Sequence, residues 1–176
     1  MTQRVLILAT NGFEQSELME PKAALEAAGF ETVVASPEGG EIKGWKDKNW
    51  GKSVTVDADL GDVSASDFDA LMLPGGQMNP DILRMDKRAI DLIAAFNEAD
   101  KPIAAICHAP WLLAEADIID GRSVTSWPSL RTDLENAGAN VLDEQVVVDG
   151  NLITSRKPED IPAFNEALIA MLREGV

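Results

Sequence analysis

The chain has 176 residues, 45% of them apolar, and a formal net charge of -15 at pH 7. This length and composition predict one domain, 1-176, with a single core. The negative charge disfavours binding of nucleic acid or anionic lipid through a general basic surface. A single cysteine excludes an internal disulfide, and there is no signal-peptide pattern and no apolar run of roughly 18 residues. We therefore expect a cytoplasmic protein without membrane contact.

Strands and helices are expected to alternate along the chain. Strands are predicted at residues 5–9, 32–35, 54–56, 70–73, 103–106, 123–126, 146–148 and 152–155, and helices at residues 14–28, 87–99, 109–114, 130–137 and 160–173. Pro21 should bend or restart the first helix, and Gly29 should end it. Asp-Gly-Asn at residues 149–151 predicts a hairpin. Repeated strand-helix units favour an α/β fold, with a mostly parallel sheet covered by helices on both faces.

The least regular stretch is residues 38–52, which we expect to form a hairpin-like excursion on the surface. Trp45 and Trp50 lie in it, close to several lysines. Two interpretations remain open for these tryptophans. They cover an interface or a pocket, or they simply anchor the loop.

The only cysteine, Cys107, and the only histidine, His108, follow the predicted strand at residues 103–106. Pro110 suits the first turn of the helix that comes next. A strand, a sharp turn and a helix form a nucleophile elbow, which exposes a side chain above the sheet while main-chain N–H groups face its target. The helix N-terminus also favours a thiolate, and His108 is a candidate general acid or base. The alternative is a small, buried and unreactive thiol, the commoner role of a lone cysteine.

Two further turns are expected at the same edge of the sheet. Gly75 and Gly76 either bring main-chain N–H groups close to a ligand or form an ordinary turn. Glu14 and Glu17 share one face of a helix's first turn, where acidic side chains are favoured and usually face water. A protonated carboxyl within reach of Cys107 would instead donate a hydrogen bond to the thiolate.

Five motifs spread over nearly the whole chain carry a family resemblance. They are G-F-E-Q-S-E-L at residues 12–18, D-A-L-M-L-P-G-G at 69–76, A-I-C-H-A-P at 105–110, V-T-S-W-P-S-L-R-T-D-L-E-N-A-G at 124–138 and V-V-V-D-G-N-L-I-T-S-R at 146–156. On these motifs the chain resembles the DJ-1/PfpI superfamily. It is most similar to the PfpI-type branch of intracellular cysteine peptidases and stress proteins.

The resemblance implies a flavodoxin-like three-layer sandwich with Cys107 as the nucleophile. It also implies that Glu17 hydrogen-bonds the thiol and that Glu14 is a second carboxylate nearby. The main-chain N–H groups of Gly76 and His108 correspond to the oxyanion donors of the family.

The resemblance further implies a homodimer or a larger homo-oligomer. In PfpI-type members a glutamate from a neighbouring subunit orients the histidine. The matching stretch here, Q-M-N-P-D, is one residue longer and places Asp81 where that glutamate would fall. Trp127 stands where relatives often carry a tyrosine, and with Gly75 it is expected to line the pocket.

These positions predict a cysteine-dependent stress-response enzyme without a cofactor. Addition of Cys107 to a carbonyl would serve a glyoxalase, a deglycase or a peptidase, so the partner is a small carbonyl compound or a peptide. The alternative is a stress-linked chaperone or redox sensor in which Cys107 is oxidised without turnover. A glutaminase is less favoured because it needs a downstream His-x-Glu pair. Cys107 and His108 alone make a poor metal site, so no metal is expected.

Overall fold

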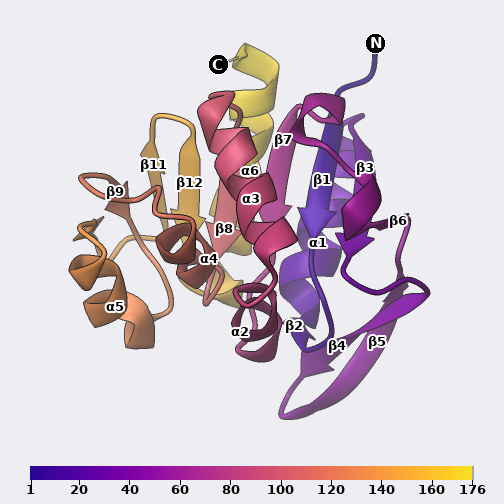
Figure 1. The fold of residues 1–176 in the computed structure, drawn as a ribbon, viewed down its shortest axis with the longest axis horizontal. Helices are drawn as coiled ribbons and strands as arrows, with labels where there is room; N and C mark the ends of the chain where they lie inside the picture. Colours follow the sequence, from indigo (N-terminus) through magenta and orange to yellow (C-terminus); the bar gives the residue numbers. More distant parts are fainter. Residues whose placement is uncertain (176) are drawn as a thin grey trace.

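A seven-stranded sheet runs through the centre of the molecule. This computed structural model describes residues 1–175. The strands are β1 (Arg4–Leu8), β3 (Glu31–Ser36), β6 (Ala58–Asp59), β7 (Ala70–Leu73), β8 (Ile103–Ile106), β11 (Val146–Asp149) and β12 (Leu152–Ser155). Their order is β11-β12-β8-β7-β1-β3-β6, and all neighbours pair in parallel except β11 with β12 (Figure 1). The predicted α/β fold with a mostly parallel sheet is confirmed.

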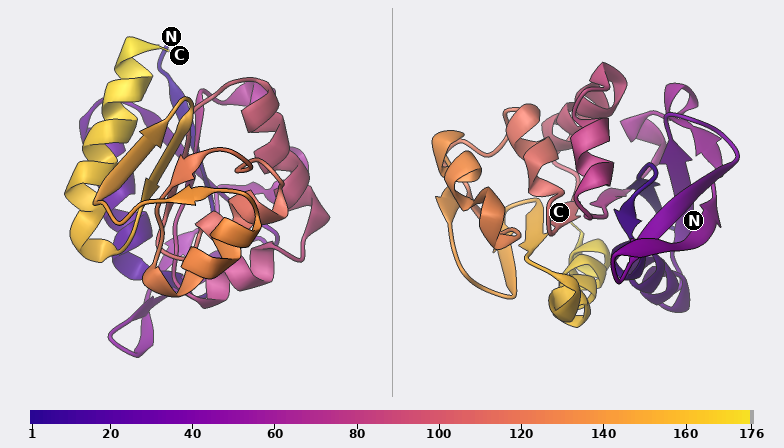
Figure 2. Two further views of the ribbon diagram at one scale, coloured as in Figure 1. Left: turned by 90° about the vertical axis from the view of Figure 1, so that its left-hand side faces the viewer. Right: turned by 90° about the horizontal axis from the view of Figure 1, so that it is seen from below.

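Helices cover both faces of this sheet. They are α1 (Gln15–Ala27), α2 (Met78–Leu83), α3 (Lys87–Glu98), α4 (Pro110–Glu115), α5 (Arg131–Asn136) and α6 (Ile161–Glu174). Figure 2 shows α6 on one side of the sheet and α3, α4 and α5 on the other. Short 3₁₀ helices cover Leu60–Asp62, Ala65–Asp67, Pro128–Leu130 and Pro158–Asp160.

Alternate residues of each strand enter two separate cores. In β1, Leu6 packs into the cluster that contains α3 and α4 residues, whereas Ile7 packs into the cluster that contains Leu18 of α1 and Phe164 of α6. Successive strand side chains point to opposite faces, so a sheet covered on both sides needs continuous apolar runs. The parallel strands also end together, and the turns after β1, β7 and β8 meet at one edge.

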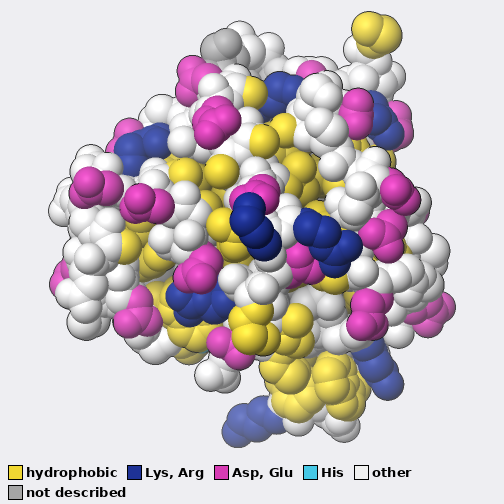
Figure 3. All heavy atoms as spheres, viewed as in Figure 1, with side chains coloured by type: hydrophobic (Ala, Val, Ile, Leu, Met, Phe, Trp, Pro, Cys, Tyr) yellow, Lys and Arg dark blue, Asp and Glu magenta, His cyan; other side chains and the backbone are white. Residues whose placement is uncertain are grey.

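Two small sheets flank the main one. The strands β4 (Glu41–Lys46) and β5 (Asn49–Thr55) form the hairpin expected within residues 38–52, and β2 (Phe13–Glu14) pairs with β4. Apolar side chains gather over the lower end of this hairpin, with basic side chains beside them (Figure 3). The strands β9 (Ser123–Val124) and β10 (Asn140–Val141) form the second small sheet.

Two local predictions need correction. The first helix is not restarted at Pro21, since α1 is continuous and Pro21 lies buried within it. It ends as expected: Gly29 has φ +95°, and the N–H groups of Gly29 and Phe30 bond to carbonyls of the last turn. The predicted strand 123–126 is shorter and pairs only with β10, because the Thr125 N–H donates to the Thr154 side chain instead.

No helix within residues 1–175 combines the length and the apolar character needed to cross a bilayer.

A buried ion pair fixes the chain between β12 and α6. Asp160 is 1% exposed, and it accepts hydrogen bonds from the Arg156 main-chain N–H at 3.0 Å and from Arg156 Nε at 2.9 Å. Replacement by alanine leaves the guanidinium without its buried partner. We predict that Asp160→Ala lowers the free energy of unfolding by about 2 to 4 kcal/mol in chemical denaturation. Asp143→Asn, which removes the exposed partner of the same Arg156, should cost much less; equal losses would contradict this assignment.

Candidate active site

Cys107 occupies a sharp turn directly after β8. Its φ is +65°, a left-handed conformation that is rare for residues other than glycine. Two hydrogen bonds hold the turn: the Cys107 N–H donates to the Ser155 carbonyl at 3.0 Å, and the Trp127 N–H donates to the Cys107 carbonyl at 2.9 Å. The main chain thus holds the cysteine in a strained conformation, as the predicted nucleophile elbow requires.

A pocket of about 370 Å³ opens over Cys107. Its lining residues are Glu14, Glu17, Trp45, Asp47, Gly76, Gln77, Cys107, His108, Trp127, Pro158 and Glu159. They come from β2 and the start of α1, from the turns after β7 and β8, from the β4–β5 hairpin and from the segments before α5 and α6. The structure therefore brings together most of the residues singled out in the sequence, and Cys107 is 6% exposed at this site.

The Gly-Gly turn after β7 packs tightly against the cysteine. A Cβ atom on Gly75 would come within 2.6 Å of Glu17 Oε1, the Ile106 carbonyl oxygen and Cys107 Cβ. Gly76 has φ +81°, and a Cβ there would meet the main chain of the turn after β1 at 2.6 Å. Both positions need glycine for close approach of main chains, which favours the first of the two interpretations of this turn.

The sequence did not single out Asn79, which is fully buried in α2. Its Nδ2 donates to the carbonyls of Pro74 and Gly75, at 2.9 and 3.2 Å, and its Oδ1 accepts from the Thr10 N–H at 2.8 Å. Asn79 therefore ties the turn after β7 to the end of β1. The short helix α2 has no apolar periodicity, so only the tertiary structure reveals this role.

Glu17 is a fully buried carboxyl at the base of the pocket. Its Oε1 accepts a hydrogen bond from the Gly75 N–H at 3.1 Å, whereas Oε2 has no partner within residues 1–175. Burial, followed by the negative charge of Glu14, raises the pKa of Glu17 to about 8, although contacts with Cys107 and the Gly-Gly turn act in the opposite direction. Glu17 is therefore mostly protonated at neutral pH.

Opposing influences act on the thiol of Cys107. The pKa of Cys107 is raised overall, because burial and then the negative charge of an ionised Glu17 outweigh the main-chain N–H groups of Gly76 and His108, which lower it. The repulsion from Glu17 disappears when that carboxyl is protonated. The pair thus resists a second negative charge, and the thiolate forms more readily while Glu17 keeps its proton than after Glu17 has ionised.

His108 lies beside the thiol despite being its neighbour in sequence. The Cys107 Sγ and His108 Nδ1 atoms are 3.2 Å apart, within the reach of a proton transfer. Burial lowers the pKa of His108, so the imidazole is neutral at pH 7. Its ring stacks on Trp127 at an interplanar angle of 20° and meets Trp111 edge-on.

The other residues singled out in the sequence lie either in the pocket or on the surface. Glu14 and Trp127 line the pocket, whereas Gly75, which was also expected there, does not line it and packs against the cysteine instead. Burial followed by the charge of Asp47 raises the pKa of Glu14. Asp81 is exposed in the first turn of α2 and does not line this pocket. Its predicted role depends on a neighbouring subunit and stays a prediction.

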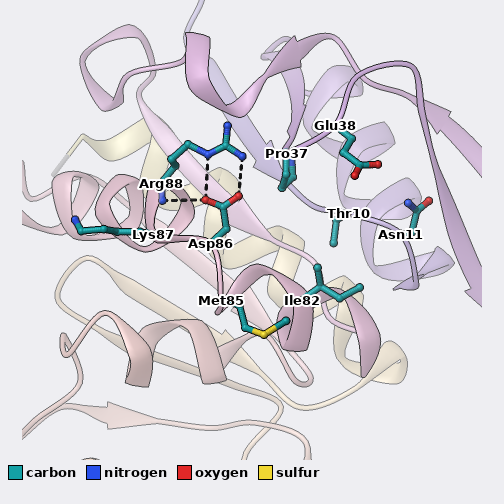
Figure 4. Close-up of a pocket in the computed structure, with 9 residues that line it drawn as sticks. All are labelled: Thr10, Asn11, Pro37, Glu38, Ile82, Met85, Asp86, Lys87 and Arg88. Carbon is teal, nitrogen blue, oxygen red and sulfur yellow. Dashed lines mark hydrogen bonds and ion pairs between the residues drawn. The ribbon is translucent and has the colours of Figure 1, made fainter.

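A larger cavity, of about 480 Å³, lies at the end of β1 away from Cys107 (Figure 4). Its lining residues are Thr10, Asn11, Pro37, Glu38, Ile82, Met85, Asp86, Lys87 and Arg88. The charged groups within it partly neutralise each other, since Asp86 accepts hydrogen bonds from Arg88. This set contains no nucleophile with an adjacent base, so the smaller Cys107 pocket is the better candidate for catalysis.

The raised pKa of Glu17 predicts a specific dependence of stability on pH. An unfolded glutamate ionises near its ordinary value of 4.5, whereas folded Glu17 keeps its proton up to about pH 8. The folded state therefore binds one more proton between these values, and its advantage shrinks as the pH rises. Relative to Glu17→Gln, the wild type should lose about 1.4 kcal/mol of unfolding free energy per pH unit.

Chemical denaturation of both proteins at several pH values measures this difference. Glu20→Gln, on the exposed side of the same helix, is the matched control and should follow the wild type. A constant difference between wild type and Glu17→Gln from pH 5 to pH 8 would contradict a protonated Glu17.

Comparison with known proteins places the chain among relatives of its own length. "General stress protein 18" of Bacillus subtilis (strain 168) is 47% identical over 99% of this chain and 100% of its own. "Putative cysteine protease YraA" of the same organism is 42% identical, over 98% and 100%. "Protein/nucleic acid deglycase 2" of Escherichia coli (strain K12) is 41% identical, over 98% and 99%.

A solved structure has the same fold as this chain. A two-domain protein of Anabaena variabilis, with DJ-1/ThiJ/PfpI-like and ferritin-like domains, superposes with a TM-score of 0.93 at 38% identity. The match covers 98% of this chain and 48% of that protein. The model of the DJ-1/PfpI family matches residues 3–171. With the elbow, the Gly-Gly turn and the buried glutamate in place, the chain belongs to the DJ-1/PfpI family.

Proposed function

We propose that the protein is a cysteine-dependent stress-response enzyme acting on reactive carbonyl compounds, as a glyoxalase or a deglycase. The observation that carries the proposal is the placement of Cys107 at a strained elbow, with two main-chain N–H groups near Sγ and a buried carboxyl beside it. The pocket of about 370 Å³ suits a small aldehyde or the end of a larger adduct. One relative is named a deglycase, which supports the same class of chemistry.

The reaction begins when the Cys107 thiolate adds to the carbonyl carbon, forming a C–S bond and placing the negative charge on oxygen. The N–H groups of Gly76 and His108, which favour negative charge at this position, stabilise that oxyanion. Glu17 supplies a proton to the oxyanion, and His108 Nδ1, 3.2 Å from Sγ, moves protons during formation and breakdown of the adduct. For methylglyoxal the sum of the reaction is addition of water to give lactate.

A peptidase is the second candidate, because one relative carries a cysteine protease name. The same addition to a peptide carbonyl would start that reaction. Stable oxidation of Cys107 without turnover is the alternative from a different class.

Replacement of the cysteine tests the proposal directly. We predict that wild type consumes methylglyoxal and forms lactate, and that Cys107→Ser loses this activity at least about 10³-fold, because the hydroxyl is a far weaker nucleophile at this site. Cys107 is the only cysteine, so residual activity in the variant cannot come from another thiol. Thermal unfolding of both proteins checks that the variant is folded.

Two results would contradict carbonyl turnover. One is equal activity of Cys107→Ser and wild type. The other is no turnover by wild type, with an intact-mass gain of two oxygen atoms on Cys107 after mild peroxide, which would identify a redox sensor.

A further inference from the structure

The pocket over Cys107 has an unusually acidic lining. Four of its residues carry carboxyl groups: Glu14, Glu17, Asp47 and Glu159. Among residues 1–175 no lysine or arginine lines the pocket, and none of the four takes part in a salt bridge. Glu17 is mostly protonated, so the negative charge comes from Glu14, Asp47 and Glu159, which have no ion-pair partner within residues 1–175 and act on whatever enters the pocket.

The acidic surface continues beyond the pocket. A second hollow, of about 410 Å³, shares Glu14, Asp47, Pro158 and Glu159 with the first. It adds Glu20 as well as one basic residue, Lys46. The two hollows adjoin at the shared residues and together make a groove, with Cys107 in its inner half. Asp47 and Glu159 stand at the border between its two halves.

Aromatic rings border the inner half of this groove. Trp45 reaches it from β4 and Trp127 from the segment before α5. Trp50 holds Trp45 edge-on, with ring centroids 5.3 Å apart, and Trp127 stacks on His108. Of the two interpretations of Trp45 and Trp50, covering a pocket or anchoring the loop, the first applies to Trp45, because it lines the pocket. Indole faces attract cations, so the aromatic and acidic linings favour the same charge.

Glu17 places a polar atom at the base of the same pocket. This side chain is fully buried and lines the pocket, yet its Oε2 has no partner within residues 1–175. A buried polar atom without a partner is costly, and a polar group of a bound molecule would satisfy it.

We propose that Asp47 and Glu159 are specificity-determining residues that hold a positive charge next to the reacting carbonyl. The preferred substrates are then extended cationic carbonyl compounds, such as adducts that keep a charged amino or guanidino group along the groove. Anionic carbonyl compounds, such as oxo acids and phosphorylated sugars, are disfavoured. This inference rests on the proposed function for the reaction, but the charge selection itself is a property of the groove.

Labelling of Cys107 tests the charge selection without any turnover. A methanethiosulfonate transfers its thioalkyl group to the thiolate, so that a mixed disulfide forms and methanesulfinate leaves. Reagents with a trimethylammonium or a sulfonate group differ mainly in charge. Because Cys107 is the only thiol, intact mass reports the rate at this site alone. The ratio of the two rates is then divided by the same ratio for mercaptoethanol in solution.

In wild type we expect this normalised ratio to favour the cationic reagent about tenfold at low salt, and to fall as the ionic strength rises. Asp47→Asn and Glu159→Gln should each reduce the ratio about threefold, and the double variant should bring it close to one. Glu98→Gln on α3, outside both hollows, is the control for total charge and should leave the ratio unchanged. A wild-type ratio near one, or the same fall in Glu98→Gln as in the groove variants, would overturn the proposal.

A turnover assay separates this inference from the proposed function. Methylglyoxal forms hemithioacetals with thiocholine and with mercaptopropionate, which carry opposite charges beside the same reacting group. The proposal predicts a higher kcat/KM for the cationic hemithioacetal in wild type and a smaller preference in the double variant. Turnover of both compounds at equal kcat/KM would refute the substrate assignment. Turnover of neither, with the labelling ratio intact, would refute the carbonyl enzyme and support charge selection alone.

Discussion

The contact between a buried carboxyl and a buried thiol is the constraint on which the site depends. Glu17 and Cys107 are too enclosed to carry two negative charges, because burial penalises each charge and each anion repels the other. The pair therefore titrates as a unit. When its single charge lies on sulfur, the carboxyl retains a proton that it can give to a developing oxyanion. The acid, the nucleophile and the main-chain donors are already in place before a substrate arrives.

The fold explains how a buried carboxyl and a strained, buried cysteine are held side by side. In the parallel sheet the turns after β1, β7 and β8 share one edge, so Glu17, the Gly-Gly turn and Cys107 meet although they are far apart in sequence. Hydrogen bonds across that edge, including those of the fully buried Asn79, fix the main chain around the strained Cys107. Cys107 itself belongs to the core cluster that contains the α1 and α6 residues. The stability of the sheet thus offsets local strain and the burial of polar groups.

Local sequence patterns predicted much of the fold and the centre of the site. The short apolar run before Cys107 and the proline after it indicated a strand-to-helix turn, and the helical spacing behind Glu17 indicated the neighbouring helix. Asn79 and Asp47 were not identified. Asn79 lies in a helix too short to show periodicity, and Asp47 reaches the pocket only because the β4–β5 hairpin folds back over it. Such roles arise from contacts distant in sequence, which periodicity does not record.

The protonation state of Glu17 while Cys107 is ionised tests the account most directly. The thiolate can be followed by its ultraviolet absorbance, with Cys107→Ser as the blank, and the Glu17 carboxyl by isotope-edited infrared spectroscopy with Glu17→Gln as the reference. Below about pH 8, where Glu17 keeps its proton, the account predicts that any thiolate absorbance appears while the protonated carbonyl band of Glu17 persists. Loss of that band well below pH 8, without any thiolate absorbance, would contradict it, since the single charge would then lie on the carboxylate.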